Sequence, residues 1–121
     1  MVRTVPAKAE SLRDHFEANT FHLTHARNCL DHSHSPLRAI KQMIEVTRPG
    51  GIVFLNHAVS EGENAGYRGL HQWNFQERHG DFVISAPGRR TVNVSQSLAN
   101  LADVSAQLGT NNWLTVVVRK R

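Results

Sequence analysis

The sequence predicts a single α/β domain with a sheet of parallel strands, a helix crossover and a C-terminal antiparallel hairpin. Its 121 residues allow one ordinary domain, spanning residues 1–121. A strand pattern at Phe21–Arg27, an amphipathic helix pattern from Pro36 and a second strand pattern at Ile52–Leu55 form a compact βαβ unit. The strands of such a unit are parallel and are joined by a right-handed crossover. Near the end of the chain, two β-prone segments flank a turn, which predicts the hairpin.

The composition excludes several classes of protein. Hydrophobic residues make up 40% and charged residues 20% of the chain, which is typical of a globular domain and not of a disordered one. The longest apolar stretch, Gly51–Leu55, is far shorter than the roughly 20 residues of a membrane-spanning helix. Residues Met1–Ala9 lack the apolar core of a secretory signal, and the lone Cys29 cannot form an internal disulfide. We therefore expect a cytoplasmic protein with no membrane contact.

The chain is basic, with 14 Lys and Arg residues against 10 Asp and Glu residues and a net charge of +4. These basic residues are scattered along the sequence, except for the run Arg119–Arg121. A terminal run of three is more often a solvated end than a phosphate contact. Nucleic-acid binding is therefore not expected.

The first elements are short. Leu12 and Phe16 are spaced i, i+4, which predicts a helical turn over Ser11–Phe16. Phe21–Arg27 has the pattern of a modest strand, and Asn28–Ser35 is predicted as a polar loop.

The central helix has the clearest signal. Ser35 is a good N-cap, and Pro36 suits the first helical position, where its missing N–H costs nothing. The segment Pro49–Gly51 is expected to end the helix, because proline disfavours the helical region for the residue before it. Ile52–Leu55 is continuously apolar, which predicts a strand covered on both faces. The buried stripe of the helix consists of Leu37, Ile40, Met43, Ile44 and Thr47.

The second half is less regular. Asn56–Asn74 is polar and contains glycine, which predicts a long loop with at most a short helix. Asp81–Ser85 and Arg90–Val94 form a predicted hairpin, and Gln96–Ala102 a short helix. Asp103–Gln107 and Trp113–Arg119 are expected to pair as an antiparallel hairpin at the sheet edge.

These segments resemble one family. Phe21–His32 resembles the fourth strand and following loop of class I S-adenosylmethionine-dependent methyltransferases. Ser35–Phe54 resembles the helix, the Arg-Pro-Gly-Gly turn and the fifth strand of that family, and the closing hairpin resembles its last two strands. Gly66–Phe75 is similar to a stretch found in some bacterial members. The resemblance covers Ala7 to Arg119 and implies a truncated Rossmann-like methyltransferase sheet, S-adenosylmethionine as the cofactor and a small molecule as the acceptor.

One half of the family pattern does not occur in this sequence. The family binds its cofactor mainly on a glycine-rich loop after its first strand, where glycine allows close backbone approach. The chain contains no G-x-G motif, and its first strand resembles the fourth strand of the family. The resemblance therefore implies the C-terminal half of a methyltransferase, which is not active alone. The alternative is a non-catalytic half-domain that dimerises or binds a partner.

Candidate cofactor contacts lie at the end of the first predicted strand. Ligands of open α/β sheets bind at the carboxyl ends of the strands. By resemblance, Ala26, Arg27 and Asn28 line the methionine part of S-adenosylmethionine. The alternative for these three residues is a simple exit from strand to loop.

Candidate catalytic and acceptor-binding residues follow both strands of the βαβ unit. His32 and His57 are candidate bases, because histidine titrates near neutral pH. The alternative for His32 is a solvated loop residue. No metal site is expected, since His32 and His34 lack a convincing set of further ligands. By resemblance, the acceptor substrate is bound by Glu61, Tyr67, His71 and Trp73. The aromatic residues of this group are alternatively a satellite core under a long loop.

The first strand also carries the prediction about partners. In the family, the fourth strand pairs with the first strand at the sheet centre. Without that neighbour, Phe21–Arg27 has an edge of unpaired N–H and C=O groups that invites another strand. We expect a homo-oligomer through this edge, or a complementing chain that supplies the missing half.

Overall fold

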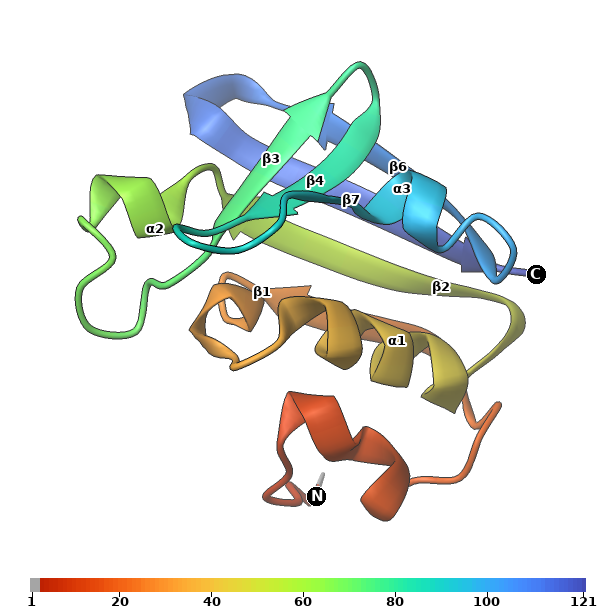
Figure 1. Ribbon diagram of the computed structural model, residues 1–121. Helices are drawn as coiled ribbons and strands as arrows, with labels where there is room; N and C mark the ends of the chain where they lie inside the picture. Colours follow the sequence, from red (N-terminus) through yellow and green to blue (C-terminus); the bar gives the residue numbers. More distant parts are fainter. Residues whose placement is uncertain (1–2) are drawn as a thin grey trace.

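The computed structural model describes residues 3–121 and contains two sheets (Figure 1). A four-stranded sheet has the order β1-β2-β7-β6, and a three-stranded sheet has the order β3-β4-β5. Over the described residues 3–121, no helix has both the length and the apolar character to cross a membrane. The elements are η1 (Ala9–Asp14), β1 (Phe21–Arg27), η2 (Leu30–His32), α1 (Pro36–Val46), β2 (Thr47–Ala58), α2 (Glu61–Asn64), β3 (Asn74–Arg78), β4 (Asp81–Ser85), β5 (Val92–Asn93), α3 (Val94–Ser97), β6 (Ala102–Leu108), η3 (Thr110–Asn112) and β7 (Trp113–Lys120).

The predicted βαβ unit is confirmed. β1 and β2 are parallel, and α1 connects them. The Ser35 hydroxyl oxygen accepts a hydrogen bond from the Arg38 N–H at 3.3 Å, and Pro36 occupies the first helical turn. The buried stripe of α1, including Ile40 and Met43, packs into the common core. The N-cap and the helical spacing are therefore sufficient to place this helix.

The helix ends earlier than predicted. α1 stops at Val46, three residues before the Pro49–Gly51 segment that was expected to end it. Thr47 already pairs with Phe21 of β1, so it belongs to β2 and not to the helix. Glycine at position 51 does not end the helix; it is required because the backbone there packs closely against its neighbours. A Cβ at this position would lie 2.8 Å from the Arg48 carbonyl oxygen and 2.9 Å from that of His22.

The C-terminal hairpin is confirmed, and its last strand is central. β6 and β7 pair antiparallel, with Val104 opposite Val118. β7 also pairs antiparallel with β2, where Leu55 lies opposite Val116. The last strand of the chain is therefore held between two others, and β6 forms the edge.

The smaller sheet covers one face of the larger one, together with α1 and α3 (Figure 1). Phe75, Phe82 and Ile84 contribute to a single core with Leu55 and Leu114 of the larger sheet. The predicted hairpin around residues 86–89 is confirmed as β4–β5, and β3 adds a strand that the sequence did not indicate.

The short helix before β6 lies earlier than predicted. It was expected over Gln96–Ala102, whereas α3 spans Val94–Ser97. The reason is a cap, because the Asn93 side-chain oxygen accepts a hydrogen bond from the Gln96 N–H at 3.0 Å. Ala102 then begins β6.

The face of the four-stranded sheet that points away from the core is partly exposed to solvent. The expectation that Ile52–Leu55 is covered on both faces is wrong. Val53 and Leu55 are buried, but Ile52 and Phe54 remain half-exposed on the opposite face. Leu23 lies beside Ile52 in the register and is 60% exposed. Among the described residues, the helices and the small sheet lie on the Val53 side, which leaves this outer face partly apolar and open (Figure 1).

Candidate functional site

The site begins where β1 and β2 end. Asn28 has a positive φ of 49°, which turns the chain out of β1. Its N–H donates a hydrogen bond to the Asn56 carbonyl oxygen at 2.7 Å, and its side-chain oxygen accepts one from the Ala58 N–H at 3.1 Å. The loop after β1 is therefore fixed to the end of β2. Parallel strands whose carboxyl ends meet in this way form the usual ligand-binding edge of an α/β sheet.

The loop after β1, predicted as a polar loop, is partly buried. It contains the turn η2, in which Leu30 and Asp31 are buried. The buried Leu30 side chain joins the core. Its anchoring draws the neighbouring Asp31 carboxyl group inward, where the side chain is only 3% exposed. A buried carboxylate requires donors or cations, and His71 supplies one at Oδ2.

Three side chains gather near this carboxylate, and we call Asp31, His32, Glu61 and His71 the Asp31 cluster. The Nδ1 atom of His71 lies 2.8 Å from Oδ2 of Asp31 and 3.3 Å from Oε2 of Glu61. The Nε2 atom of His32 lies 3.8 Å from Oδ1 of Asp31. Two loops thus meet here, one after β1 and one between β2 and β3.

The electrostatics of the cluster favour a charged imidazole. The hydrogen bond from His71 to Asp31 raises the pKa of the His71 side chain above its usual value of 6.5. The rings of His32 and His71 meet edge to face, with centroids 4.8 Å apart. The cluster can therefore hold a proton, or another cation, between two carboxylates and two imidazoles.

His57, one of the two candidate bases, lies in the interior. It is 1% exposed, and its ring packs against Phe75 with centroids 4.6 Å apart. Its Nε2 atom accepts a hydrogen bond from the Leu30 N–H at 3.2 Å. Burial lowers the pKa of His57 to about 4, so the ring is neutral at pH 7. This geometry supports a role in holding η2 beneath the Asp31 cluster.

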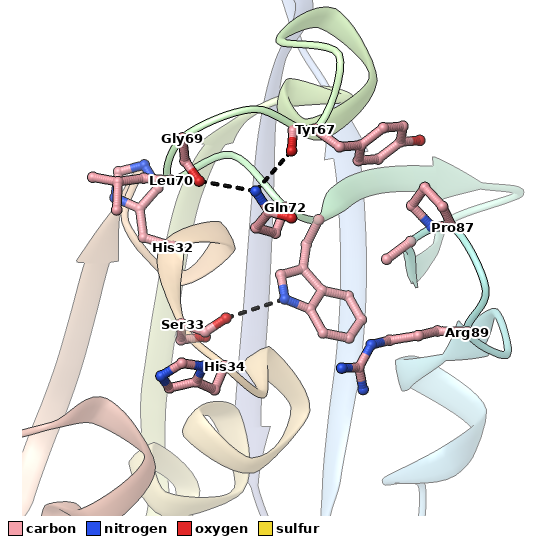
Figure 2. Close-up of a pocket in the computed structure, with 11 residues that line it drawn as sticks. His32, Ser33, His34, Tyr67, Gly69, Leu70, Gln72, Pro87 and Arg89 are labelled. Atoms are coloured by element: carbon pink, nitrogen blue, oxygen red, sulfur yellow. Dashed lines mark hydrogen bonds between the residues drawn. The ribbon is translucent and has the colours of Figure 1, made fainter.

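A cleft of about 480 Å³ opens beside the cluster (Figure 2). His32 and Trp73 line it, and the Trp73 indole N–H donates a hydrogen bond to the Ser33 carbonyl oxygen at 3.1 Å. The Arg89 guanidinium carbon lies 5.1 Å from the centre of the Trp73 ring, which brings a cation to the cleft. Figure 2 shows that these groups come from the loop after β1, the loop before β3 and the turn after β4.

The Gln72 side chain stabilises one wall of this cleft through hydrogen bonds (Figure 2). Its amide nitrogen donates to the carbonyl oxygens of Tyr67 and Gly69, both at 2.8 Å. Tyr67 also accepts a hydrogen bond from the Asn74 amide at its hydroxyl oxygen. The wall is therefore polar and internally hydrogen-bonded.

The structure divides the acceptor-binding candidates into two groups. Tyr67 and Trp73 line the cleft, whereas Glu61 and His71 belong to the Asp31 cluster. His32 belongs to both, and so connects them.

The candidate cofactor contacts lie apart from the cleft. Ala26 is buried in the core, and Asn28 forms the turn at the end of β1. Arg27 is exposed, and its guanidinium carbon lies 5.3 Å from the centre of the Trp113 ring, on the outer face of the sheet. All three residues therefore occupy the strand end that the resemblance indicated, and Arg27 faces the side of the sheet away from the core.

Two functional residues were not found from the sequence. Asp31 lies in the predicted polar loop Asn28–Ser35, and no sequence pattern indicated its contact with His71. Arg89 was placed only in a turn. No short-range pattern relates either residue to its partner, because the contacts join segments far apart in the chain.

Comparison with known proteins agrees with this architecture. Residues 1–55 match a family model described as a methyltransferase domain. The match includes β1, α1 and most of β2, which are the elements of the βαβ unit. No curated protein matches the sequence.

Three solved structures are similar. One is a protein of Pyrococcus horikoshii OT3 (13% identity, TM-score 0.55), of which 60% is covered by 95% of this chain. A second, from Methanosarcina mazei, is described as an S-adenosylmethionine-dependent methyltransferase (17% identity, TM-score 0.49, 94% of this chain on 65% of that one). The third is described as a methyltransferase from Haloferax volcanii in complex with the Trm112 methyltransferase activator (10% identity, TM-score 0.50, 94% of this chain on 59%).

The chain thus spans about 60% of the length of the Pyrococcus and Haloferax proteins, and these two likenesses show a shared fold. The sheet is the Rossmann-like one that the sequence predicted, with a parallel pair, a helix crossover and an antiparallel hairpin. Together, the family match and the shared fold support a relationship between this methyltransferase-like chain and the class I S-adenosylmethionine-dependent methyltransferases.

Proposed function

We propose that this chain forms the acceptor-binding half of a methyltransferase that moves a methyl group from S-adenosylmethionine to a small molecule, and that it is not active alone. The observation that carries the proposal is the cleft beside Trp73, which is lined by the loop after β1, the loop before β3 and the turn after β4. Its polar wall and the Arg89 cation suit a small polar or anionic acceptor.

The chemistry is a displacement at the sulfonium methyl group. A nucleophilic oxygen or nitrogen of the acceptor bonds to the methyl carbon, the carbon–sulfur bond breaks, and its electron pair stays on sulfur. The acceptor proton leaves to a base or to water. Most of the rate enhancement in such a reaction comes from holding the two reactants in line. His32, which lines the cleft, is our candidate to take the proton.

We assign the cofactor to the end of β1 beside Arg27, apart from the cleft that would hold the acceptor. We propose that Ala26, Arg27 and Asn28 face the methionine part of S-adenosylmethionine once a complementary half is in place. Support comes from their position at the end of β1. Glu61, Tyr67, His71 and Trp73 are proposed to face the acceptor.

The two tryptophans of the chain allow a direct test. Trp73 lines the cleft, and Trp113 lies beside Arg27 on the outer face. In ¹⁵N-labelled protein, their indole N–H signals report on the two regions separately. We expect small phenols, amines or carboxylates to shift the Trp73 signal and leave the Trp113 signal in place. If no compound of such a panel shifts Trp73, the acceptor role is wrong.

The dependence on a complementary half is tested in the same protein. Titration calorimetry with S-adenosylmethionine and S-adenosylhomocysteine is expected to show no binding by the chain alone at millimolar ligand. Micromolar binding, accompanied by a shift of the Trp113 signal, would show instead that this chain holds the cofactor without help.

A second candidate function is non-catalytic association through β1. Within residues 3–121, no strand pairs with the outer edge of β1, and Leu23 on this strand is highly exposed. An open edge next to an apolar face favours a second copy or a complementing chain. The Haloferax structure offers a parallel, since that protein is described in complex with an activator.

A further inference from the structure

We propose that Asp31, His32 and His71, with Glu61 as a fourth ligand, bind a divalent transition-metal ion, and that Zn²⁺ is the ion their chemistry fits best. The sequence alone did not predict this site, because its ligands come from two loops that only the fold brings together. The argument rests on the spacing of the ligand atoms and on one buried oxygen.

The spacing of the ligand atoms suits a single ion. One donor atom from each of Asp31, His32 and His71 lies within 4.8 Å of the other two. Ligands held at about 2.0–2.2 Å from a tetrahedral Zn²⁺ stand about 3.3–3.5 Å from one another. The close separations in the Asp31 cluster are 2.8, 3.3 and 3.8 Å, which lie on both sides of that value. Changes of about 1.5 Å or less in these separations, within reach of side-chain rotation, therefore place an ion at the centre.

The second observation is an unsatisfied oxygen. Oδ1 of Asp31 is buried and has no hydrogen-bond partner in the part of the chain that the structure describes. Nε2 of His32 is 3.8 Å from this oxygen, which is too far for a hydrogen bond. Leaving a carboxylate oxygen buried without a donor is costly. A metal ion between Asp31 and His32 would remove that cost.

The donor set identifies the class of metal. Two imidazole nitrogens with carboxylate oxygens favour Zn²⁺ and its transition-metal neighbours over Mg²⁺ and Ca²⁺, which prefer oxygen ligands alone. The His32 and His71 side chains are each about one third exposed, so an ion can enter from solvent. Binding displaces the proton that His71 shares with Asp31, because only an unprotonated nitrogen can bind the metal.

Such an ion would act in two ways. It would clamp the loop before β3 onto the loop after β1, because each loop supplies two ligands. It would also stand at one end of the cleft, since His32 belongs to the cleft wall. There it could bind the acceptor oxygen and lower its pKa, in place of an imidazole base. This catalytic role rests on the proposed function, whereas ion binding itself does not.

The test is a Zn²⁺ titration of the tag-free chain after dialysis against a chelator. Competition with a chromophoric zinc indicator gives the affinity and the stoichiometry. We expect one ion per chain, and an affinity reduced by about 100-fold or more in His71→Ala and in His32→Ala. His34→Ala and His79→Ala are matched controls, because both remove an exposed histidine outside the cluster. Their affinities should equal that of the wild type.

Co²⁺ provides a spectroscopic measurement that does not depend on stability. Absorption of the intensity typical of tetrahedral Co²⁺ is expected in the wild type and should be lost in His71→Ala. Asp31→Asn should also lose it, and circular dichroism would establish that this variant is folded. The proposal is overturned if no ion binds at about 100 µM Zn²⁺, or if the two control variants weaken binding as much as the cluster variants do. Neither result would alter the outcome of the Trp73 experiment.

Discussion

The Nδ1 atom of His71 lies 2.8 Å from Oδ2 of Asp31 and connects two loops that are 40 residues apart in the sequence. The contact fixes the segment before β3 on the turn that follows β1. One partner is a buried carboxylate, and the other is an imidazole that reaches solvent. This pair therefore links the interior of the domain to the loop before β3, and it leads to the first prediction.

Replacing Asp31 with asparagine should lower the pKa of His71. The carboxylate stabilises the charged imidazole, so the pKa of His71 in the folded protein exceeds its usual value of 6.5. The resulting stabilisation is complete below about pH 6.5 and is lost as the pH rises through the raised pKa. An NMR titration of the His71 ring in chelator-treated protein measures the shift.

Glu61→Gln is the control for that titration. Glu61 acts on His71 less strongly than Asp31 does, so this variant should shift the His71 pKa less than Asp31→Asn. An equal effect of the two variants would contradict the assignment of the Asp31 hydrogen bond as the main cause.

His57 should make the folded protein less stable as the pH falls below neutral. Its pKa is about 4 in the folded protein and about 6.5 when unfolded, so the unfolded state binds its proton first as the pH falls. The stabilisation is present above pH 6.5 and is lost progressively towards pH 4. Between pH 7 and pH 5, this single group should lower the free energy of unfolding by about 2 kcal/mol.

Urea unfolding of the wild type and of His57→Gln at both pH values isolates the contribution of His57. Glutamine retains an oxygen that can accept the Leu30 N–H, but it does not titrate. The stability difference between the two proteins should therefore change with pH by about the 2 kcal/mol given above. A difference that is constant from pH 7 to pH 5 would be inconsistent with a depressed His57 pKa.

Gly62→Ala should disturb the cleft. A Cβ at Gly62 would lie 2.9 Å from the backbone carbonyl carbon and oxygen of Trp73, and the backbone cannot move aside without shifting the loop. We expect a loss of about 1–3 kcal/mol in stability and a changed Trp73 indole signal. Gly109→Ala is the matched control, because its nearest contact, 3.5 Å, is an ordinary one. Equal stability of the two variants would refute the close-packing argument.

The open edge of β1 should mediate self-association. Light scattering at high protein concentration is expected to show a dimer, and Leu23→Lys should shift it towards monomer, because lysine on an edge strand opposes pairing. Leu108→Lys provides a comparison on the opposite edge strand, β6, where the leucine is 48% exposed. A wild-type protein that remains monomeric would rule out association through this edge.

Local signals were enough to predict most of the larger sheet. The N-cap at Ser35, the helical stripe and the apolar run that follows placed α1 and β2, and the limits of β1 agree with the prediction. The errors arose where tertiary contacts overrode local preference. Thr47 leaves the helix early because it pairs with Phe21, and α3 begins early because Asn93 caps it.

The site was harder to predict than the fold. Its candidate residues were mostly placed near the correct strand ends, because ligands of α/β sheets gather there. The partnership of Asp31 with His71 was missed, since polarity along a loop does not reveal which side chain the fold will bury. Burial of Asp31 follows from the anchoring of Leu30, which is a property of the packed core and not of the local sequence.

The position of β7 has a consequence for how the protein is made. β7 is the last strand in the chain, yet it lies between β2 and β6. During synthesis on the ribosome, β1, α1 and β2 emerge first and can pair with one another, but β2 and β6 have no common neighbour until Trp113–Lys120 has left the exit tunnel. Closure of the larger sheet therefore waits for these eight residues. A ribosome that stalls before them would release a chain whose sheet is split in two.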